Sequence, residues 1–141
     1  MKKLHDWDAR LARWATGQVG TPFAWGGTDC AILAFEALDA MAGGNLAAQY
    51  RGEWNTELGA RRFQIKHRTD LLKVILRAGC APVEPHFQQR GDLLIVEENG
   101  FQCAHVCMGL RSLSSWPDMG VHWCRTLHLL KRGAAVYRLQ D

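Results

Sequence analysis

The residues best suited to covalent chemistry in this chain are one cysteine and one histidine. Cys30 ends the stretch WGGTDC and begins the apolar run CAILAFEALDAM, which is typical of a buried helix. At the first turn of that helix, unpaired backbone N–H groups and the positive end of the helix dipole favour an anion. For cysteine the anion is the nucleophilic thiolate. The position therefore predicts a lowered thiol pKa for Cys30 and a backbone amide placed to bind an oxyanion.

The residues before Cys30 suit the surroundings of a nucleophile. Either Thr28 or Asp29 can cap the helix, and glycines let a substrate or another backbone segment come close. We expect the substrate-contacting residues to be Trp25, Gly26, Gly27 and Asp29. The structural alternative is that Cys30 is a small buried residue, as free cysteines often are, and that Trp25 fills the core.

A base for the thiol is expected in a later strand. His105 lies in the stretch CAHVCM, where strand alternation sends Cys103, His105 and Cys107 to one face. If that face packs on the Cys30 helix, the imidazole meets the thiol. His105 can then take the proton of Cys30 and later protonate a leaving amine.

Metal binding is a competing use of these residues. Two predicted strands carry soft ligands for zinc or an iron–sulfur cluster, namely Cys103, His105 and Cys107 on one and His122 and Cys124 on the other. Ligands at alternate positions of one regular strand converge poorly on a single ion. We therefore expect no metal and no other cofactor, and we interpret the three late cysteines as packing residues.

Hydrophobic periodicity predicts helices first and an antiparallel sheet afterwards. The expected helices cover residues 6–18, 30–41, 47–50, 56–65, 69–77 and 127–131. The expected strands form a hairpin over 92–108, turning at Asn99-Gly100, and two short strands at 121–124 and 135–139. This order is typical of an α+β domain, and a length of 141 residues fits a single domain over 1–141.

Composition and charge argue against a nucleic-acid or membrane partner. The net charge is +3 and the 17 Lys and Arg residues are scattered, so no nucleic-acid partner is expected. The N-terminal stretch MKKLHDWDARLARW lacks the apolar segment of a signal peptide, and no run is apolar enough to insert in a membrane. The chain is expected to be made in the cytoplasm, where its five cysteines stay reduced.

Three stretches give the chain a resemblance to a known family. GTPFAWGGTDCAIL, RGDLLIVEENG and HVCMGL follow the order in which NlpC-type cell-wall peptidases show an aromatic-Gly-Gly loop, an Asp-Cys helix start, a Gly-Asp strand and a His-Val strand. The whole chain, including AAQYRGEWNTELGARR and AVYRL, also resembles small uncharacterised phage and prophage proteins, often encoded among tail genes.

The resemblance implies a papain-like fold with N-terminal helices packed on a C-terminal antiparallel sheet. It also implies a catalytic Cys30–His105 dyad and cleavage of peptide bonds in peptidoglycan stems. The implied partners are the peptidoglycan peptide and other phage tail proteins, and the implied location is the host cytoplasm during synthesis and then the virion tail.

The chain departs from the peptidase pattern at three places. Phe23 stands where those enzymes carry a tyrosine whose hydroxyl points at the nucleophile, and phenylalanine has no donor. Ala31 and Ile32 replace Ser and Gly. The residue that orients the imidazole is not defined by the sequence. The candidates for it are Ser114, Ser115 and Asp118.

These observations leave functions of different classes. The first, to which the sequence leans, is a tail-associated cysteine peptidase, a hydrolase favoured by the presence of Cys30 and His105. The second is a structural or adaptor protein of the tail tip that keeps the fold with little or no activity, which Phe23 and Ala31 favour. The third is a metal or iron–sulfur binding tail protein.

Overall fold

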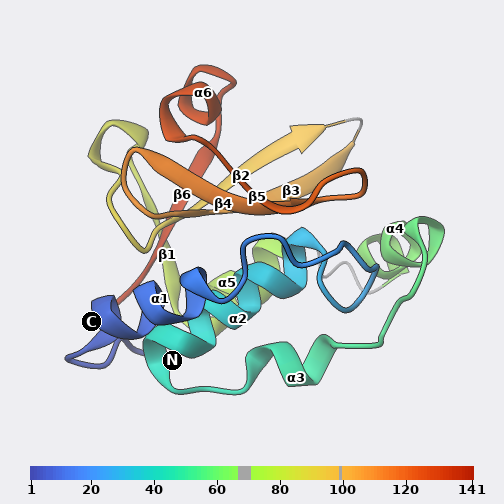
Figure 1. Ribbon diagram of the computed structural model, residues 1–141, viewed down its shortest axis with the longest axis horizontal. Helices are drawn as coiled ribbons and strands as arrows, with labels where there is room; N and C mark the ends of the chain where they lie inside the picture. Colours follow the sequence, from blue (N-terminus) through green and yellow to red (C-terminus); the bar gives the residue numbers. More distant parts are fainter. Residues whose placement is uncertain (67–70, 99) are drawn as a thin grey trace.

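The chain folds into helices that cover one face of an antiparallel sheet (Figure 1). The computed structural model describes residues 1–66, 71–98 and 100–141. Within these residues the sheet has the strand order β1-β6-β2-β3-β4-β5, and each neighbouring pair is antiparallel. In Figure 1, α1 to α5 lie below the sheet and α6 lies above it.

The described elements have the following bounds. The helices are α1 (Trp7–Thr16), α2 (Cys30–Ala42), α3 (Leu46–Tyr50), α4 (Glu57–Lys66), α5 (Leu71–Ala78), the 3₁₀ helix η1 (Pro85–Phe87) and α6 (Thr126–Lys131). The strands are β1 (Cys80–Val83), β2 (Leu93–Glu98), β3 (Phe101–Cys107), β4 (Arg111–Trp116), β5 (Gly120–Arg125) and β6 (Ala135–Leu139).

The α+β class, the helices and the hairpin expected from the sequence are confirmed. Residues 69 and 70 of the fifth expected helix, and Asn99 of the expected turn, lie outside the described residues. No helix among the described residues is long and apolar enough to cross a membrane.

The sequence did not predict β1 and β4. Strand β1 contains Pro82, which cannot donate to a ladder, but β1 pairs only with β6 at the edge of the sheet, where proline is tolerated. Strand β4 has serines at buried positions, so it lacks the apolar alternation that marks a strand. Strand β1 precedes the hairpin and pairs with the last strand, and the described strands all lie between Cys80 and Leu139, in the C-terminal half of the chain, as expected.

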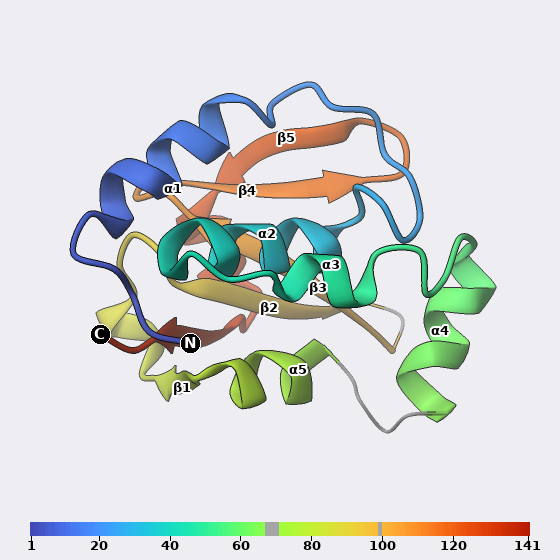
Figure 2. The ribbon, with the colours of Figure 1, turned by 90° about the horizontal axis from the view of Figure 1, so that it is seen from below.

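Helix α2 is the centre of the core, and Figure 2 shows it running beneath the middle of the sheet. It is apolar on most sides, with Ile32, Ala34, Phe35 and Leu38 at most 2% exposed. Gly43 ends it with a left-handed φ of 71°, which explains the Gly-Gly stop in the sequence. Such an all-round apolar helix must be covered on several sides, and it packs against α1, α3, β3 and β4.

The two faces of the sheet belong to different apolar clusters. The face toward α2 carries Leu93, Ile95, Ala104, Val106 and Leu113. The face toward α6 carries Leu94, Val96, Cys107 and Val136, which pack with Leu129 of α6. This division decides on which side of the sheet each residue of β3 lies.

An ion pair joins the start of β2 to β6. The carboxylate of Asp92 is 0% exposed and accepts bonds of 2.8 Å from both Nε and Nη2 of Arg138. It also accepts the backbone N–H of Gln89 at 2.8 Å. The aspartate of the Gly-Asp motif is therefore a structural residue that fixes β6 beside β2.

We predict that Arg138→Met destabilises the protein by about 3–5 kcal/mol, because it leaves the buried Asp92 carboxylate without its counter-charge. Urea unfolding measures the effect. Arg10→Met is the matched control, because Arg10 pairs with Asp6 on the exposed surface of α1 and its loss should change the unfolding midpoint little. Equal midpoints for the two variants would contradict the structural role of the buried pair.

Candidate functional site

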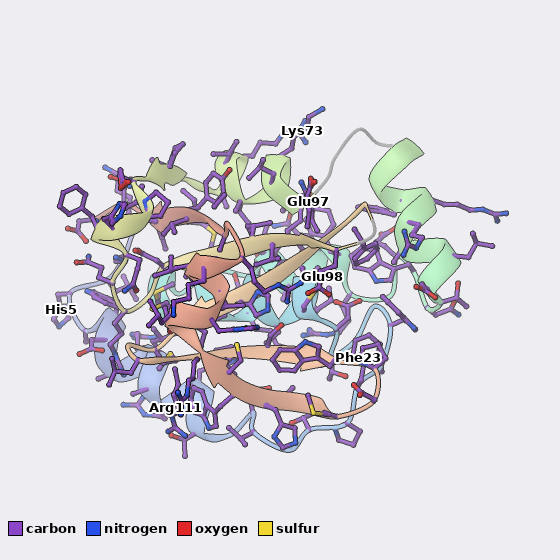
Figure 3. All side chains as sticks on the ribbon, turned by 90° about the horizontal axis from the view of Figure 1, so that it is seen from above. His5, Phe23, Lys73, Glu97, Glu98 and Arg111 are labelled. Atoms are coloured by element: carbon purple, nitrogen blue, oxygen red, sulfur yellow. The ribbon has the colours of Figure 1, made fainter. Side chains whose placement is uncertain are left out.

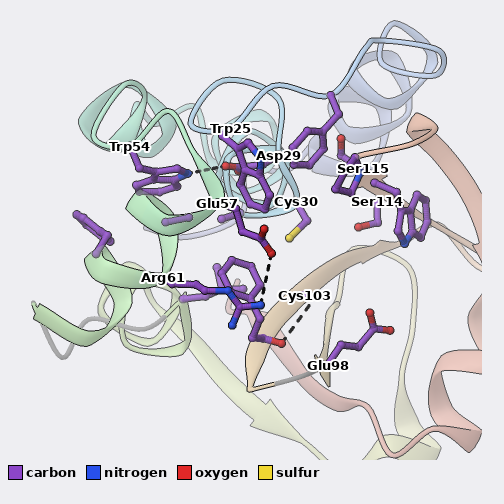
Figure 4. A pocket seen from close by; sticks show the side chains of 18 of the residues that line it. Trp25, Asp29, Cys30, Trp54, Glu57, Arg61, Glu98, Cys103, Ser114 and Ser115 are labelled. Carbon is purple, nitrogen blue, oxygen red and sulfur yellow. Dashed lines mark hydrogen bonds and ion pairs between the residues drawn. The ribbon is translucent and has the colours of Figure 1, made fainter.

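Cys30 faces a pocket of about 320 Å³ at one end of the sheet (Figure 4). The pocket opens where β3 and β4 separate, because these strands pair only at Val106–Leu113 and Cys107–Ser112. Beyond those pairs, β3 contributes Cys103 and β4 contributes Ser114, Ser115 and Trp116 to the wall. The remaining lining is largely aromatic, namely Phe23, Trp25, Phe35, Trp54, Phe63 and Phe101.

The structure confirms the expected helix start at Cys30. Cys30 is the first residue of α2, and Asp29 is its N-cap, with Oδ1 accepting the Ile32 N–H at 3.0 Å. The N–H groups of the first helical turn have no earlier helical carbonyl to bond. The backbone N–H of Cys30 is therefore available to donate a hydrogen bond beside the Cys30 thiol.

Asp29 connects the chain segments that surround Cys30. Its Oδ2 accepts the Gly26 N–H at 2.7 Å and the indole N–H of Trp54 at 2.6 Å, in addition to the cap bond of Oδ1. The residue is 3% exposed. With three N–H donors already bound, its carboxylate positions the loop, and this occupancy does not favour the substrate contact expected for it.

The glycine turn is shaped by Trp54. Gly26 has a φ of 74°, and a Cβ at that position would lie 1.7 Å from the carbonyl oxygen of Trp54. Gly27 lies in the same turn, next to the side chain of Ala24. Of the four expected substrate-contacting residues, Trp25 and Asp29 line the pocket, whereas Gly26 packs against the chain that carries Trp54.

The nearest thiol partner of Cys30 is Cys103. A hydrogen bond with Cys103, together with burial, raises the pKa of the Cys30 thiol well above its ordinary value. The same hydrogen bond lowers the pKa of Cys103. The expectation of a lowered pKa for Cys30 is therefore wrong in this arrangement. These pKa directions make Cys103 the more acidic thiol of the pair.

His105 lies on the opposite side of β3 from the α2 core. Ala104 and Val106 pack with α2, whereas Cys107 packs under α6, so alternation puts His105 on the α6 side. The expected dyad requires the face with Cys103, His105 and Cys107 to pack on the Cys30 helix. Cys107 does not do so. Only Cys103, at the end where the strands separate, reaches Cys30. Among the described residues, Cys30 and His105 share no hydrogen bond.

The imidazole of His105 is buried and held in one tautomer. Its Nδ1 lies 3.2 Å from the carbonyl oxygen of Leu94, and its ring centroid lies 5.9 Å from that of Trp116. Because a carbonyl only accepts, Nδ1 carries the proton and Nε2 keeps the lone pair. Burial lowers the pKa of His105, so the neutral form persists to lower pH than usual. The Leu94 carbonyl thus orients the imidazole, a role for which the sequence suggested only side chains.

The three candidates for an orienting residue have different surroundings. Ser114 donates its hydroxyl to the Ala104 carbonyl at 2.6 Å, which bridges β3 and β4. Asp118 is exposed in the turn before β5. Ser115 lines the pocket at 5% exposure, and its buried hydroxyl has no hydrogen-bond partner among the described residues. Ser115 faces the α2 side together with Leu113, two residues earlier on β4.

The alternative metal ligands are not brought together. Cys107 is buried and donates to Gln88 Oε1 at 3.1 Å, whereas His122 is exposed on the edge strand β5. Cys124 is half-buried, and burial raises its pKa to about 11. In the part of the chain that the structure describes, no three His, Cys, Asp or Glu groups converge as metal ligands.

Sequence reasoning missed Trp54 and the role of Cys103. Trp54 is 8% exposed and packs on Phe63 with ring centroids 4.9 Å apart. A tryptophan in a polar stretch between short helices gives no periodic signal. Cys103 was assigned to packing because nothing in the sequence shows that β3 and β4 separate beside it.

These features define an α+β domain that presents a helix-start thiol to an apolar pocket. Residues 2–132 match the family described as a domain of unknown function (DUF6950). The chain therefore belongs to this family. No curated protein matches the chain.

We predict that Asp29→Ala lowers the free energy of unfolding by about 2–4 kcal/mol, because the helix loses its cap and two buried N–H groups lose their acceptor. Urea unfolding followed by tryptophan fluorescence measures this. Asp118→Ala is the control, since Asp118 is exposed in a turn. A stability for Asp29→Ala equal to that of the control would mean that the three bonds do not hold the loop.

We predict that Cys103→Ala shifts alkylation of Cys30 to lower pH, because the hydrogen bond with Cys103 is the largest cause raising the pKa of Cys30. In the wild type, iodoacetamide should modify Cys103 at lower pH than Cys30. Peptide mass spectrometry over a pH series measures both sites. Cys124→Ala should leave the Cys30 profile unchanged, and an unchanged Cys30 profile in Cys103→Ala would contradict the thiol pair.

Proposed function

We propose that this protein is a thiol-dependent amide hydrolase of the papain-like, NlpC type, with Cys30 as its nucleophile. The observation that carries the proposal is the position of the Cys30 thiol, at the N-terminus of α2 and in the wall of a pocket of substrate size. Helix N-termini stabilise the negative charge that develops on sulfur and on a carbonyl oxygen during acyl transfer.

The proposed reaction proceeds through a thioester. The Cys30 sulfur bonds to the carbonyl carbon of the substrate while the carbonyl oxygen takes up the electron pair and accepts the Cys30 N–H. His105 receives the thiol proton and returns it to the nitrogen when the C–N bond breaks. Water then hydrolyses the thioester, which frees the acid and the thiol.

The neutral imidazole supports His105 in this role. Its lowered pKa keeps Nε2 able to accept a proton near neutral pH, and the Leu94 carbonyl fixes the tautomer. His105 is not bonded to Cys30 and lies on the α6 side of β3, so the proposed transfer requires the imidazole and the thiol to be brought to the same side of the strand. Cys103, whose pKa is lowered by its hydrogen bond with Cys30, is in its deprotonated form a second acceptor for the same proton.

The proposed substrate is a peptide of the peptidoglycan stem, and the proposed setting is the phage tail. Both come from the resemblance of the WGGTDC, RGD and HVCMGL stretches to NlpC-type peptidases and to small tail-region proteins. Partners would then be other tail proteins, after synthesis in the host cytoplasm.

The second candidate is an adaptor of the tail tip with little or no activity. It is favoured by the raised pKa of Cys30 and by Phe23, which lines the pocket without a hydroxyl group. An unreactive thiol in a retained pocket is what loss of activity would leave behind.

We predict that Cys30→Ser abolishes turnover of stem peptides and that His105→Ala lowers kcat at least about hundredfold, the range for loss of a general base. Cys124→Ser, which alters a thiol outside the pocket, is the control and should retain full turnover. Chromatographic detection of released fragments measures the rate. Equal turnover by Cys30→Ser and wild type would overturn the assignment, and a wild type that cleaves nothing would favour the adaptor.

A further inference from the structure

We propose that the pocket beside Cys30 binds an uncharged, apolar acyl group and that Ser115 hydrogen-bonds to its carbonyl oxygen. This inference rests on the proposed function for its chemistry, but the binding preference stands on the pocket alone. Of a stem peptide, only an uncharged acyl residue would then enter the pocket.

The pocket is walled by aromatic rings that hold one another in place. Trp25 stands edge-on between Phe23 and Phe101, with ring centroids 4.7 Å and 6.1 Å away. These three residues are only half-buried, so their ring surfaces remain open to an incoming group. Burying such surface against an apolar ligand is favourable, whereas a charged group placed against it would lose its hydration.

The charged side chains of the lining already have partners. Arg61 bonds to Glu57 at 3.5 Å, as the dashed line in Figure 4 shows, and its guanidinium also lies 5.1 Å from the centre of the Phe101 ring. Glu98 pairs with Arg132 at 2.6 Å on the α6 side of the sheet. Figure 3, seen from that side, places Glu98 and Phe23 at the same end of the molecule. These ion pairs leave the aromatic surface as the main feature that a ligand meets.

Ser115 marks where the polar atom of the ligand belongs. The residue is 5% exposed and lines the same pocket, and its hydroxyl has no hydrogen-bond partner in the part of the chain that the structure describes. Buried hydroxyl groups are rarely left unpaired, so an unpaired one in a pocket wall points to an acceptor supplied by a ligand. The carbonyl oxygen of an acyl group near Cys30 is such an acceptor, shared between the Ser115 hydroxyl and the Cys30 amide.

The volume of the pocket limits the size of the acyl group that can bind. A volume of about 320 Å³ is at the lower end of the range for small-molecule sites. It suits one medium-length aliphatic chain or one aromatic ring with its carbonyl group, rather than an extended peptide. Any remaining part of the substrate would lie outside, on the leaving-group side.

The first experiment measures binding without catalysis. Cys30→Ala is titrated with hexananilide and with adipic acid monoanilide, which has a chain of equal length ending in a carboxylate, and tryptophan fluorescence reports Trp25 and Trp116 in the wall. Hexananilide should bind at least about a hundredfold more tightly, because the carboxylate would have to be desolvated. Equal affinities, or tighter binding of the charged anilide, would overturn the proposal.

Matched variants in the Cys30→Ala background locate the ligand. Phe101→Ala should weaken hexananilide binding about tenfold through lost apolar contact, whereas Phe87→Ala should not, because Phe87 is 72% exposed on η1 outside the pocket. Ser115→Ala should weaken it about fivefold, whereas Ser112→Ala should not, because the Ser112 hydroxyl is already bonded to Thr126. Equal effects within either pair would contradict this placement.

The result is distinguishable from failure of the hydrolase proposal. If the wild type binds hexananilide selectively but releases no aniline, the pocket assignment stands and the nucleophile assignment fails. If the wild type cleaves a stem peptide faster than any apolar amide, Cys30 is confirmed as reactive and the apolar acyl group is the wrong substrate class.

Discussion

The carboxylate of Asp29 is the interaction on which the site depends. It joins segments that are separate in the sequence: the glycine turn through Gly26, the first turn of α2 through Ile32 and the α3–α4 connection through Trp54. A buried carboxylate that accepts three N–H groups is rigid, because movement of any one segment would leave a polar group unpaired away from water. The position of Cys30 relative to the pocket follows from this rigidity.

The second constraint is the separation of β3 and β4. Had the two strands paired along their full length, the ladder would have closed the space in which Cys103 meets Cys30, and Ser115 would have faced a packed core. The single side-chain bridge from Ser114 to the Ala104 carbonyl replaces part of the missing ladder. The sheet therefore gives up some backbone pairing at one end, and this separation leaves room for the pocket beside Cys30.

How far the sequence predicted the structure can be explained by the range of the interactions involved. The start of α2 at Cys30 was predictable because an N-cap and a glycine stop act within a few residues. The hairpin was predictable because β2 and β3 are adjacent in the chain. The side of the sheet on which His105 lies was not, since it depends on register against α2 and α6, and a shift of one residue reverses every side chain. Nor could the sequence show that Trp54 would bond to Asp29, because no local pattern encodes a contact between distant loops.

The thiol pair and the apolar wall both change the free energy of forming a thiolate at Cys30. The hydrogen bond with Cys103 raises the pKa of the Cys30 thiol, and burial beside the aromatic wall adds to that effect. Both are opposed by the unpaired N–H groups at the start of α2, which stabilise an anion only when it lies close to them. An apolar ligand that fills the pocket would exclude water and strengthen these short-range bonds, while its carbonyl oxygen would accept the Cys30 amide. The reactivity of Cys30 would then be low in the empty pocket and higher once the acyl group is in place.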